Sequence, residues 1–155
     1  MEISEKGIKF IQTEERFEPK SYECSAGHWT IGYGSTYYPD GTQVKSPDPP
    51  ISEPDADLLM RHVCGNYQDI VNKLLFVQLN QNQFDAIMSF VYNEGPGQFK
   101  SSTLLKRINE DPNDRTRISY EFSRWNKEED PKTKKLKPSK GLTARRKRET
   151  DLYFS

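Results

Sequence analysis

The chain has 155 residues, which is the length of a single domain. Hydrophobic residues make up 33% and charged residues 30%, so we expect a small core and a strongly charged surface. Eight Tyr, eight Phe and two Trp argue against a disordered chain. No apolar run approaches the roughly 18 residues of a membrane span, which excludes a transmembrane segment.

The net charge of zero conceals one basic region. Residues 126–148 hold ten Lys and Arg against three acidic residues, a net of +7, so the rest of the chain sums to −7. A basic end on an otherwise acidic protein suits an anionic polymer, such as nucleic acid or bacterial cell wall. The alternative interpretation is a solvated loop and helix face without a ligand.

The N-terminal third predicts one helix followed by short strands. Residues 3–13 have apolar residues at helical spacing after Ser4, a suitable N-cap, so Glu15 falls at or just beyond the helix end. Residues 21–36 are aromatic, β-branched and glycine-rich, which predicts strands joined by turns. Residues 37–50 contain Pro-Asp-Gly and three more prolines, and predict a hairpin that leads into a loop.

The remainder of the chain is predicted to be helical. Ser52 and Asp55 form a capping-box pattern before an amphipathic helix of roughly 20 residues, or about 30 Å. Further helices are predicted over residues 81–92, 101–109, 113–125 and 142–154, with a Lys- and Pro-rich loop over 126–140. The pattern indicates an α+β fold in one domain, with a β-rich lobe (14–51), a connecting helix (52–75) and a helical lobe (1–13 and 76–155).

Three residues near the N-terminus carry side chains suited to the cleavage of a glycosidic bond. Eight residues separate Glu15 from Cys24, and five separate Cys24 from Thr30. Hydrolysis of such a bond needs a protonated acid on one face of the sugar and a water-activating group on the other. Partial burial beside the β-rich lobe would help Glu15 to keep a proton. Taken singly, each residue is also an ordinary surface carboxylate, buried thiol or strand residue.

With its surroundings, this spacing resembles the phage-type lysozymes, the muramidase endolysins of glycoside hydrolase family 24. That family has Glu, eight residues, Asp or Cys, five residues and Thr, followed by a T-I-G-Y-G-like segment, which residues 30–34 match. Residues 79–86 and 93–99 also match, and the resemblance covers essentially the whole chain. Two departures are Arg16, where the family often has Gly, and residues 37–50, which are longer than the usual turn.

The resemblance implies a lysozyme-like fold and hydrolysis of the β-1,4 bond between N-acetylmuramic acid and N-acetylglucosamine, with inversion. Glu15 would be the general acid, and Cys24 and Thr30 would hold and activate the attacking water. A covalent route with Cys24 as nucleophile is the alternative mechanism. A lytic transglycosylase and a non-catalytic module that binds the cell wall are the alternative functions.

Three further residues are predicted to contact the substrate, because sugar rings are bound by aromatic faces and amide groups. They are Tyr33, Asn93 and Phe99, each of which could equally belong to the core. Trp125, Arg145 and Arg146 are assigned structural roles in the C-terminal lobe.

The expected partner is the glycan strand of peptidoglycan, bound by a monomer without a metal or other cofactor. No motif that reads nucleic acid accompanies the basic region. Cys24 and Cys64 predict two reduced thiols, with a redox-gating disulfide as the alternative. The acidic N-terminus has no apolar signal region, so we expect synthesis in the host bacterial cytoplasm and action on the cell wall, in the periplasm, after release.

Overall fold

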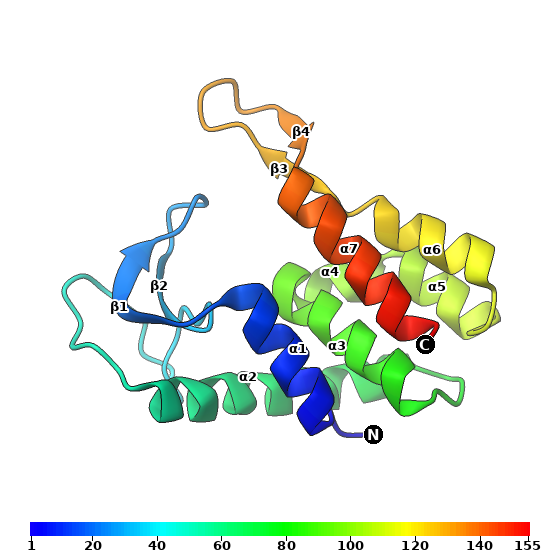
Figure 1. Cartoon of the computed structure of the whole chain (residues 1–155), viewed down its shortest axis with the longest axis horizontal. Coiled ribbons are helices and arrows are strands. Elements are labelled where there is room, and N and C mark those ends of the chain that lie inside the picture. The colour runs from blue at the N-terminus through cyan, green and yellow to red at the C-terminus, as the bar shows by residue number, and fades with distance from the viewer.

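Two lobes joined by one long helix make up the computed structural model, which describes all 155 residues (Figure 1). The helices are α1 (Glu5–Glu15), α2 (Glu53–Leu74), α3 (Gln81–Glu94), α4 (Pro96–Ser101), α5 (Thr103–Glu110), α6 (Arg115–Ser123) and α7 (Lys140–Tyr153). The strands are β1 (Glu18–Glu23), β2 (Trp29–Gly32), β3 (Lys127–Glu129) and β4 (Leu136–Pro138). This arrangement of many helices with two small sheets confirms the predicted α+β class.

The helix starts follow the capping residues of the sequence. The side chains of Ser4 and Ser52 accept hydrogen bonds from backbone N–H groups at the starts of α1 and α2. At the start of α3, Asn80 and Gln83 form a reciprocal capping box. Helix α1 ends at Glu15, and Arg16 follows it with φ 58° and ψ 149°, a conformation that favours glycine.

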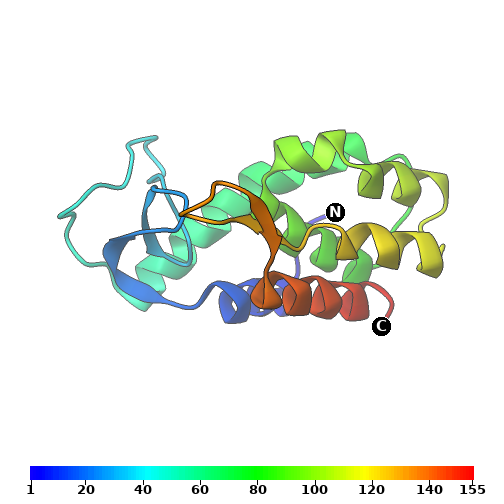
Figure 2. The ribbon, with the colours of Figure 1, turned by 90° about the horizontal axis from the view of Figure 1, so that it is seen from above.

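The helical lobe is built around α3, which packs against α1, α2, α4 and α7. All side chains from Phe84 to Val91 in α3 are buried, and the Phe90 ring meets those of Phe99, Phe122 and Trp125 edge-on. Helix α2 runs beneath both lobes, as Figures 1 and 2 show. A small second cluster, formed by Ile31, Val44 and Leu59, fixes the β-rich lobe to α2. Helix α2 therefore packs against β2 as well as against α3 and α4.

The β-rich lobe consists of the antiparallel hairpin β1–β2 and an irregular segment. Tyr22 pairs with Thr30 and Glu23 with Trp29, with a register shift nearer the start of β1. Within the segment predicted as a hairpin, only an isolated bridge between Tyr37 and Gln43 has strand-like pairing. Its prolines cannot donate to a ladder, which accounts for the lack of longer strands.

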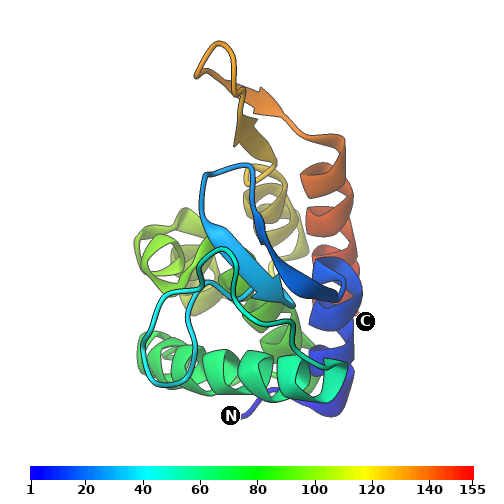
Figure 3. The same cartoon turned by 90° about the vertical axis from the view of Figure 1, so that its left-hand side faces the viewer.

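Two elements differ from the predictions. The predicted loop over 126–140 contains the hairpin β3–β4, which projects beyond the helical lobe in Figure 3. Asp130 holds its turn by accepting hydrogen bonds from the backbone of Lys132 and Thr133. Both strands are fully exposed, so the sequence has no alternation of apolar and polar residues that would predict them. The helix predicted over 101–109 is α5, which begins at Thr103 because the Ser102 hydroxyl caps its start, and the short helix α4 before it was not predicted.

Both cysteines are free thiols in the structure, so no disulfide joins them. Cys64 lies in the main core at 1% exposure, and burial raises the pKa of its thiol to about 12. Among the helices of the chain, none combines the length and apolar character needed to cross a membrane.

Candidate active site

The Glu15 carboxyl lies at the junction of the two lobes. As the last residue of α1, it has a side chain that is 17% exposed, and its Oε1 accepts a 2.6 Å hydrogen bond from Arg145 Nη1. Its Oε2 faces Gly34, where an added Cβ atom would lie 3.0 Å away. Gly34 also has φ +84°, so the glycine is required both for the backbone and for the approach of the carboxyl. The Gly-Tyr-Gly segment therefore forms a wall beside the predicted acid.

Arg145 links this carboxyl to the core of the helical lobe. Its Nε donates to Glu149 Oε1 at 3.1 Å and its Nη2 to the Ser89 carbonyl at 3.2 Å. Burial opposes the charge of Arg145, but the negative charges of Glu15 and Glu149 outweigh it and raise its pKa. The sequence assigned Arg145 a purely structural role, which is incomplete because the same guanidinium also holds Glu15.

Cys24 and Thr30 lie together on the hairpin. The Cys24 N–H donates to the His28 carbonyl at 2.8 Å, which continues the β1–β2 ladder beyond the strand end. Thr30 is 4% exposed, and its hydroxyl donates to the same carbonyl at 3.1 Å. Burial disfavours the Cys24 thiolate, but hydrogen bonds from the backbone at His28 and Ala26 lower its pKa, as does the Thr30 hydroxyl when its one hydrogen turns from the carbonyl to the thiolate. The thiol is therefore easier to ionise than an ordinary cysteine.

The pairing of β1 with β2 places the Tyr22 phenol on the same face of the hairpin as Cys24 and Thr30. Side chains alternate along a strand and paired residues share a face, so Tyr22, opposite Thr30, lies on the face of Cys24. Burial and the charges of Glu15, Glu18 and Cys24 raise the pKa of Tyr22, as expected for a phenol among these groups. Tyr22 was not among the predicted site residues. Its position two residues before Cys24 in a predicted strand is the signal that places both side chains on one face.

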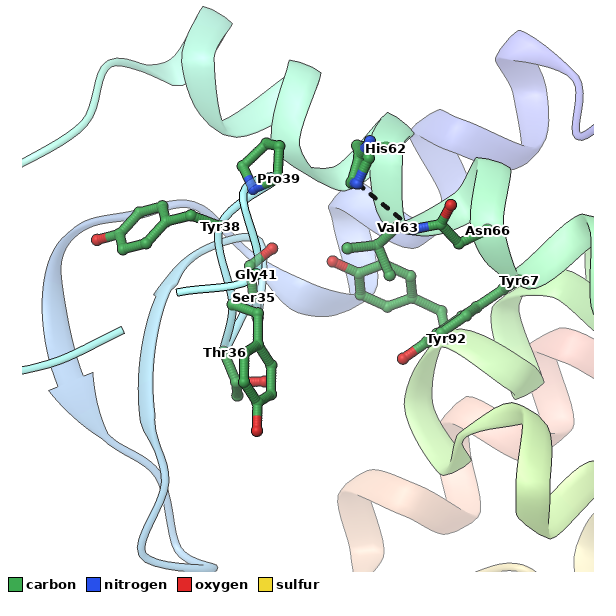
Figure 4. Close-up of a pocket in the computed structure, with 12 residues that line it drawn as sticks. Ser35, Thr36, Tyr38, Pro39, Gly41, His62, Val63, Asn66, Tyr67 and Tyr92 are labelled. Atoms are coloured by element: carbon green, nitrogen blue, oxygen red, sulfur yellow. Dashed lines mark hydrogen bonds between the residues drawn. The ribbon is translucent and has the colours of Figure 1, made fainter. Parts of the chain in front are cut away.

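A cavity of about 330 Å³ opens beside Glu15 and is called the cleft pocket here. One wall comes from residues 34–41 and the other from α2 and α3, including Tyr67 and Tyr92 (Figure 4). Gly34 and Tyr92 line the cavity. A Cβ atom added at Gly34 would contact both the Glu15 carboxyl and the Tyr92 ring, so Glu15 lies next to the cavity. The Ser35 hydroxyl on the first wall is buried without a hydrogen-bond partner in the protein. The cavity thus offers two aromatic rings close to the Glu15 carboxyl group.

The structure separates the three predicted substrate contacts. Asn93 is exposed at the end of α3, where its side-chain oxygen accepts a hydrogen bond from Arg146. Phe99 is completely buried against Phe90, and it presents no surface to a ligand. Tyr33 is 4% exposed and donates a 2.8 Å hydrogen bond to Glu53. Burial therefore gives Tyr33 and Phe99 packing roles and leaves Asn93 as the accessible residue of the three.

No group of three or more His, Cys, Asp or Glu side chains in the chain is arranged to hold a metal ion. The chemistry available at the site is that of a carboxyl, a thiol and hydroxyl groups.

The sequence of the chain is similar to those of one family of proteins. The model of the family described as phage lysozyme matches residues 12–149. An endolysin of Acyrthosiphon pisum secondary endosymbiont phage 1 is 37% identical over 155 residues, covering 100% of this chain and 99% of the relative. An endolysin of Bacillus phage PZA is 40% identical over 158 residues, and the match covers 100% of this chain but only 56% of that longer protein.

Solved structures agree with the sequence relatives. The endolysin from Escherichia coli O157:H7 phage FAHEc1 superposes with a TM-score of 0.90 at 34% identity, covering 100% of this chain and 94% of that one. A P22 lysozyme mutant superposes with a TM-score of 0.78 at 32% identity, covering 100% of this chain and 99% of the other.

Proposed function

The chain belongs to the phage lysozyme family, and we propose that it cleaves peptidoglycan with Glu15 as general acid and with Cys24 and Thr30 as the water-activating pair. As a lysozyme it is a glycoside hydrolase that breaks the bond between N-acetylmuramic acid and N-acetylglucosamine, and an endolysin uses this activity for lysis of the host cell. We propose the roles of these three residues and inversion at the anomeric carbon.

One observation carries the assignment of residues. Glu15 lies against Gly34 at the edge of the cleft pocket, while the thiol of Cys24, with its lowered pKa, lies beside Thr30 on the adjacent hairpin. A proton donor and a proton acceptor are thereby held by different elements, and both lie close enough to Tyr22 to raise the pKa of its phenol. Inverting hydrolysis requires this separation, because the water must fit between the acceptor and the sugar.

The proposed reaction begins when Glu15 gives its proton to the glycosidic oxygen as the bond to the anomeric carbon breaks. The Thr30 hydroxyl has one hydrogen, and when this hydrogen points to the His28 carbonyl its oxygen is free to accept from a water. The Cys24 thiolate accepts the second hydrogen of that water and removes it as the oxygen attacks. The anomeric configuration inverts, because attack occurs opposite to the leaving group.

The decisive experiment is turbidity loss of purified peptidoglycan with Glu15→Gln. We expect the rate to fall at least about 100-fold, the usual contribution of a general acid. Glu14→Gln is the matched control, since Glu14 is the preceding residue and pairs with Arg148 instead of Arg145. An unchanged rate in Glu15→Gln would refute the assignment.

The products distinguish the proposal from the alternative functions. Mass spectrometry of the released muropeptides should show reducing ends, whereas a lytic transglycosylase releases 1,6-anhydro ends that lack one water. Binding to peptidoglycan without any turbidity loss in the parent chain would instead indicate a binding module.

We also propose that the chain works as a monomer that is made in the host cytoplasm and does not use nucleic acid. Light scattering at working concentration should give a mass near 18.0 kDa. A stable dimer, or binding to duplex DNA as tight as to cell wall, would contradict this part.

A further inference from the structure

A second hollow lies within the β-rich lobe, and we call it the lobe pocket. It has a volume of about 290 Å³ and is lined by the β1–β2 turn, the start of β2 and residues 36–45. Thr36 and Tyr37 line both this pocket and the cleft pocket. The two hollows are therefore neighbours that share one short segment as a wall.

The lining has the composition of a carbohydrate site. Trp29 and Tyr37 supply aromatic rings, and Tyr37 is 53% exposed. The polar side chains are those of His28, Thr36, Gln43 and Lys45, and none of them makes a hydrogen bond or ion pair within the protein. Sugar rings stack on aromatic faces while their hydroxyl and acetamido groups hydrogen-bond to polar side chains. Both kinds of group are thus free in one hollow of about the volume of a small ligand.

The segment that builds the pocket is fixed in place, so the groups are held ready for a ligand. Val44 donates a 2.9 Å backbone hydrogen bond to the Thr36 carbonyl, next to the bridge between Tyr37 and Gln43. Asp48 accepts hydrogen bonds from the Lys45 backbone and the Tyr38 hydroxyl at 2.8 and 2.9 Å. Val44 itself is buried in the small core cluster. A preformed pocket loses less entropy on binding than a flexible loop.

The pocket draws several of its lining side chains from one segment of the sequence. Tyr37, Gln43 and Lys45 all lie within residues 37–50, the irregular segment of the β-rich lobe. This segment therefore gives the lobe a polar and aromatic wall.

We propose that the lobe pocket is an additional saccharide-binding subsite that holds one N-acetylhexosamine unit of a glycan strand whose neighbouring units occupy the cleft pocket. The nature of the ligand rests on the proposed function, since the cleft pocket is taken as the site of cleavage. The consequence is that affinity increases when the oligosaccharide is long enough to reach both hollows.

Nuclear magnetic resonance can test this directly, because the chain has only two Trp residues and hence two indole N–H signals. The full chain with Glu15→Gln is titrated with N-acetylglucosamine hexamer, so that cleavage does not interfere. We expect the Trp29 indole signal to shift and the signal of Trp125, in the helical lobe, to remain in place. A hexamer that binds without moving the Trp29 signal would overturn the proposal.

Variants then test the dependence on length. Gln43→Ala with Lys45→Ala removes two side chains that line only the lobe pocket, and we expect hexamer affinity to fall about tenfold while dimer affinity is unchanged. Gln78→Ala with Lys73→Ala is the matched control, because both residues are exposed near the far end of α2. Equal hexamer affinity in both double variants would refute the subsite.

The two proposals fail in different ways. If the parent chain shows no turbidity loss but the Trp29 signal still shifts with hexamer, the catalytic proposal is wrong and the saccharide subsite stands. If the parent lyses cell walls but the Trp29 signal and the length dependence are absent, only the subsite is wrong.

Discussion

Arg145 donates a 2.6 Å hydrogen bond to Glu15 across 130 positions of sequence. The contact joins the first helix of the chain to the last one, at the point where the two lobes meet (Figure 1). The guanidinium is 7% exposed and also contacts Glu149, whose side chain is completely buried. The orientation of the carboxyl that we propose as general acid is therefore coupled to the packing of the helical lobe.

Replacement of Arg145 by Ala should impair both activity and stability. The change leaves Glu149 with Arg146 as its remaining ionic partner, and breaking a buried pair of this kind costs about 3–5 kcal/mol. Chemical denaturation measures the loss of stability, and turbidity assays measure activity at a temperature where the variant is folded. Lys147→Ala is the control, since both partners of its pair with Asp151 in the same helix are exposed and the pair should contribute about 1 kcal/mol or less. Equal losses in the two variants would contradict the coupling.

Gly34→Ala should displace Glu15 and reduce lysis. The new Cβ would lie 3.0 Å from Glu15 Oε2, and the positive φ adds a backbone penalty of about 1–2 kcal/mol. Gly95→Ala is the control because Gly95, which lines neither pocket, has nearly the same φ, +91°, with nothing within 4 Å of the added atom. Gly41 is not suitable because it lines the cleft pocket. We expect similar losses of stability but a much larger loss of activity in Gly34→Ala. If both variants keep the same activity, the contact between Gly34 and Glu15 does not matter for catalysis.

The sequence was sufficient to predict the parts of the fold that depend on local signals. Ser4, Ser52 and Asn80 lie at helix starts, and the apolar spacing that follows them predicted α1, α2 and α3 to within about two residues. The hairpin β3–β4 was missed because its strands are fully exposed, with no buried face to produce alternation.

The site was predictable only where its residues are close in sequence. The spacing from Glu15 to Thr30 reflects one helix end and one hairpin, so a short motif describes it. The contact of Arg145 with Glu15 depends on how α1 and α7 pack against α3, which no local pattern reports. Tyr33 and Phe99 were misjudged for the same reason, since an aromatic residue has the same sequence signal in a core as in a cleft.

The pH dependence of lysis should identify the role of Cys24. A base must be deprotonated while the acid Glu15 keeps its proton, so the profile should be bell-shaped, and the lowered pKa of Cys24 puts the limb that reports the thiol below the ordinary thiol value of 9.0. In Cys24→Asp this limb should move to much lower pH, since a free Asp titrates at about 3.9. Rates of turbidity loss at a series of pH values at constant ionic strength measure both profiles. Cys24→Ala should lose most activity at every pH, and a Cys24→Ala profile identical to that of the parent would make the thiol a bystander.

Arg16→Gly should stabilise the chain without changing its activity. Arg16 has φ 58° and ψ 149° directly after Glu15, a region that costs about 1–3 kcal/mol for a residue with a side chain. Glycine relieves this strain but loses about 0.5–1 kcal/mol through its more flexible unfolded state, so the net gain should be about 1 kcal/mol. For a chain of this length that gain raises Tm by about 2–4 °C in a calorimetric scan.

The control for Arg16→Gly is a glycine introduced where the backbone is already helical. Thr13→Gly, two residues before Glu15 on the exposed side of α1, should lower stability by about 0.3 kcal/mol, the difference in helix propensity between Thr and Gly. Opposite signs in the two variants would show that the chain tolerates Arg at this position at the expense of stability, while the hydrogen bond from its N–H to Gln12 keeps the end of α1 in place. A lower Tm in Arg16→Gly would instead mean that the Arg16 side chain makes a stabilising contribution that outweighs its backbone strain.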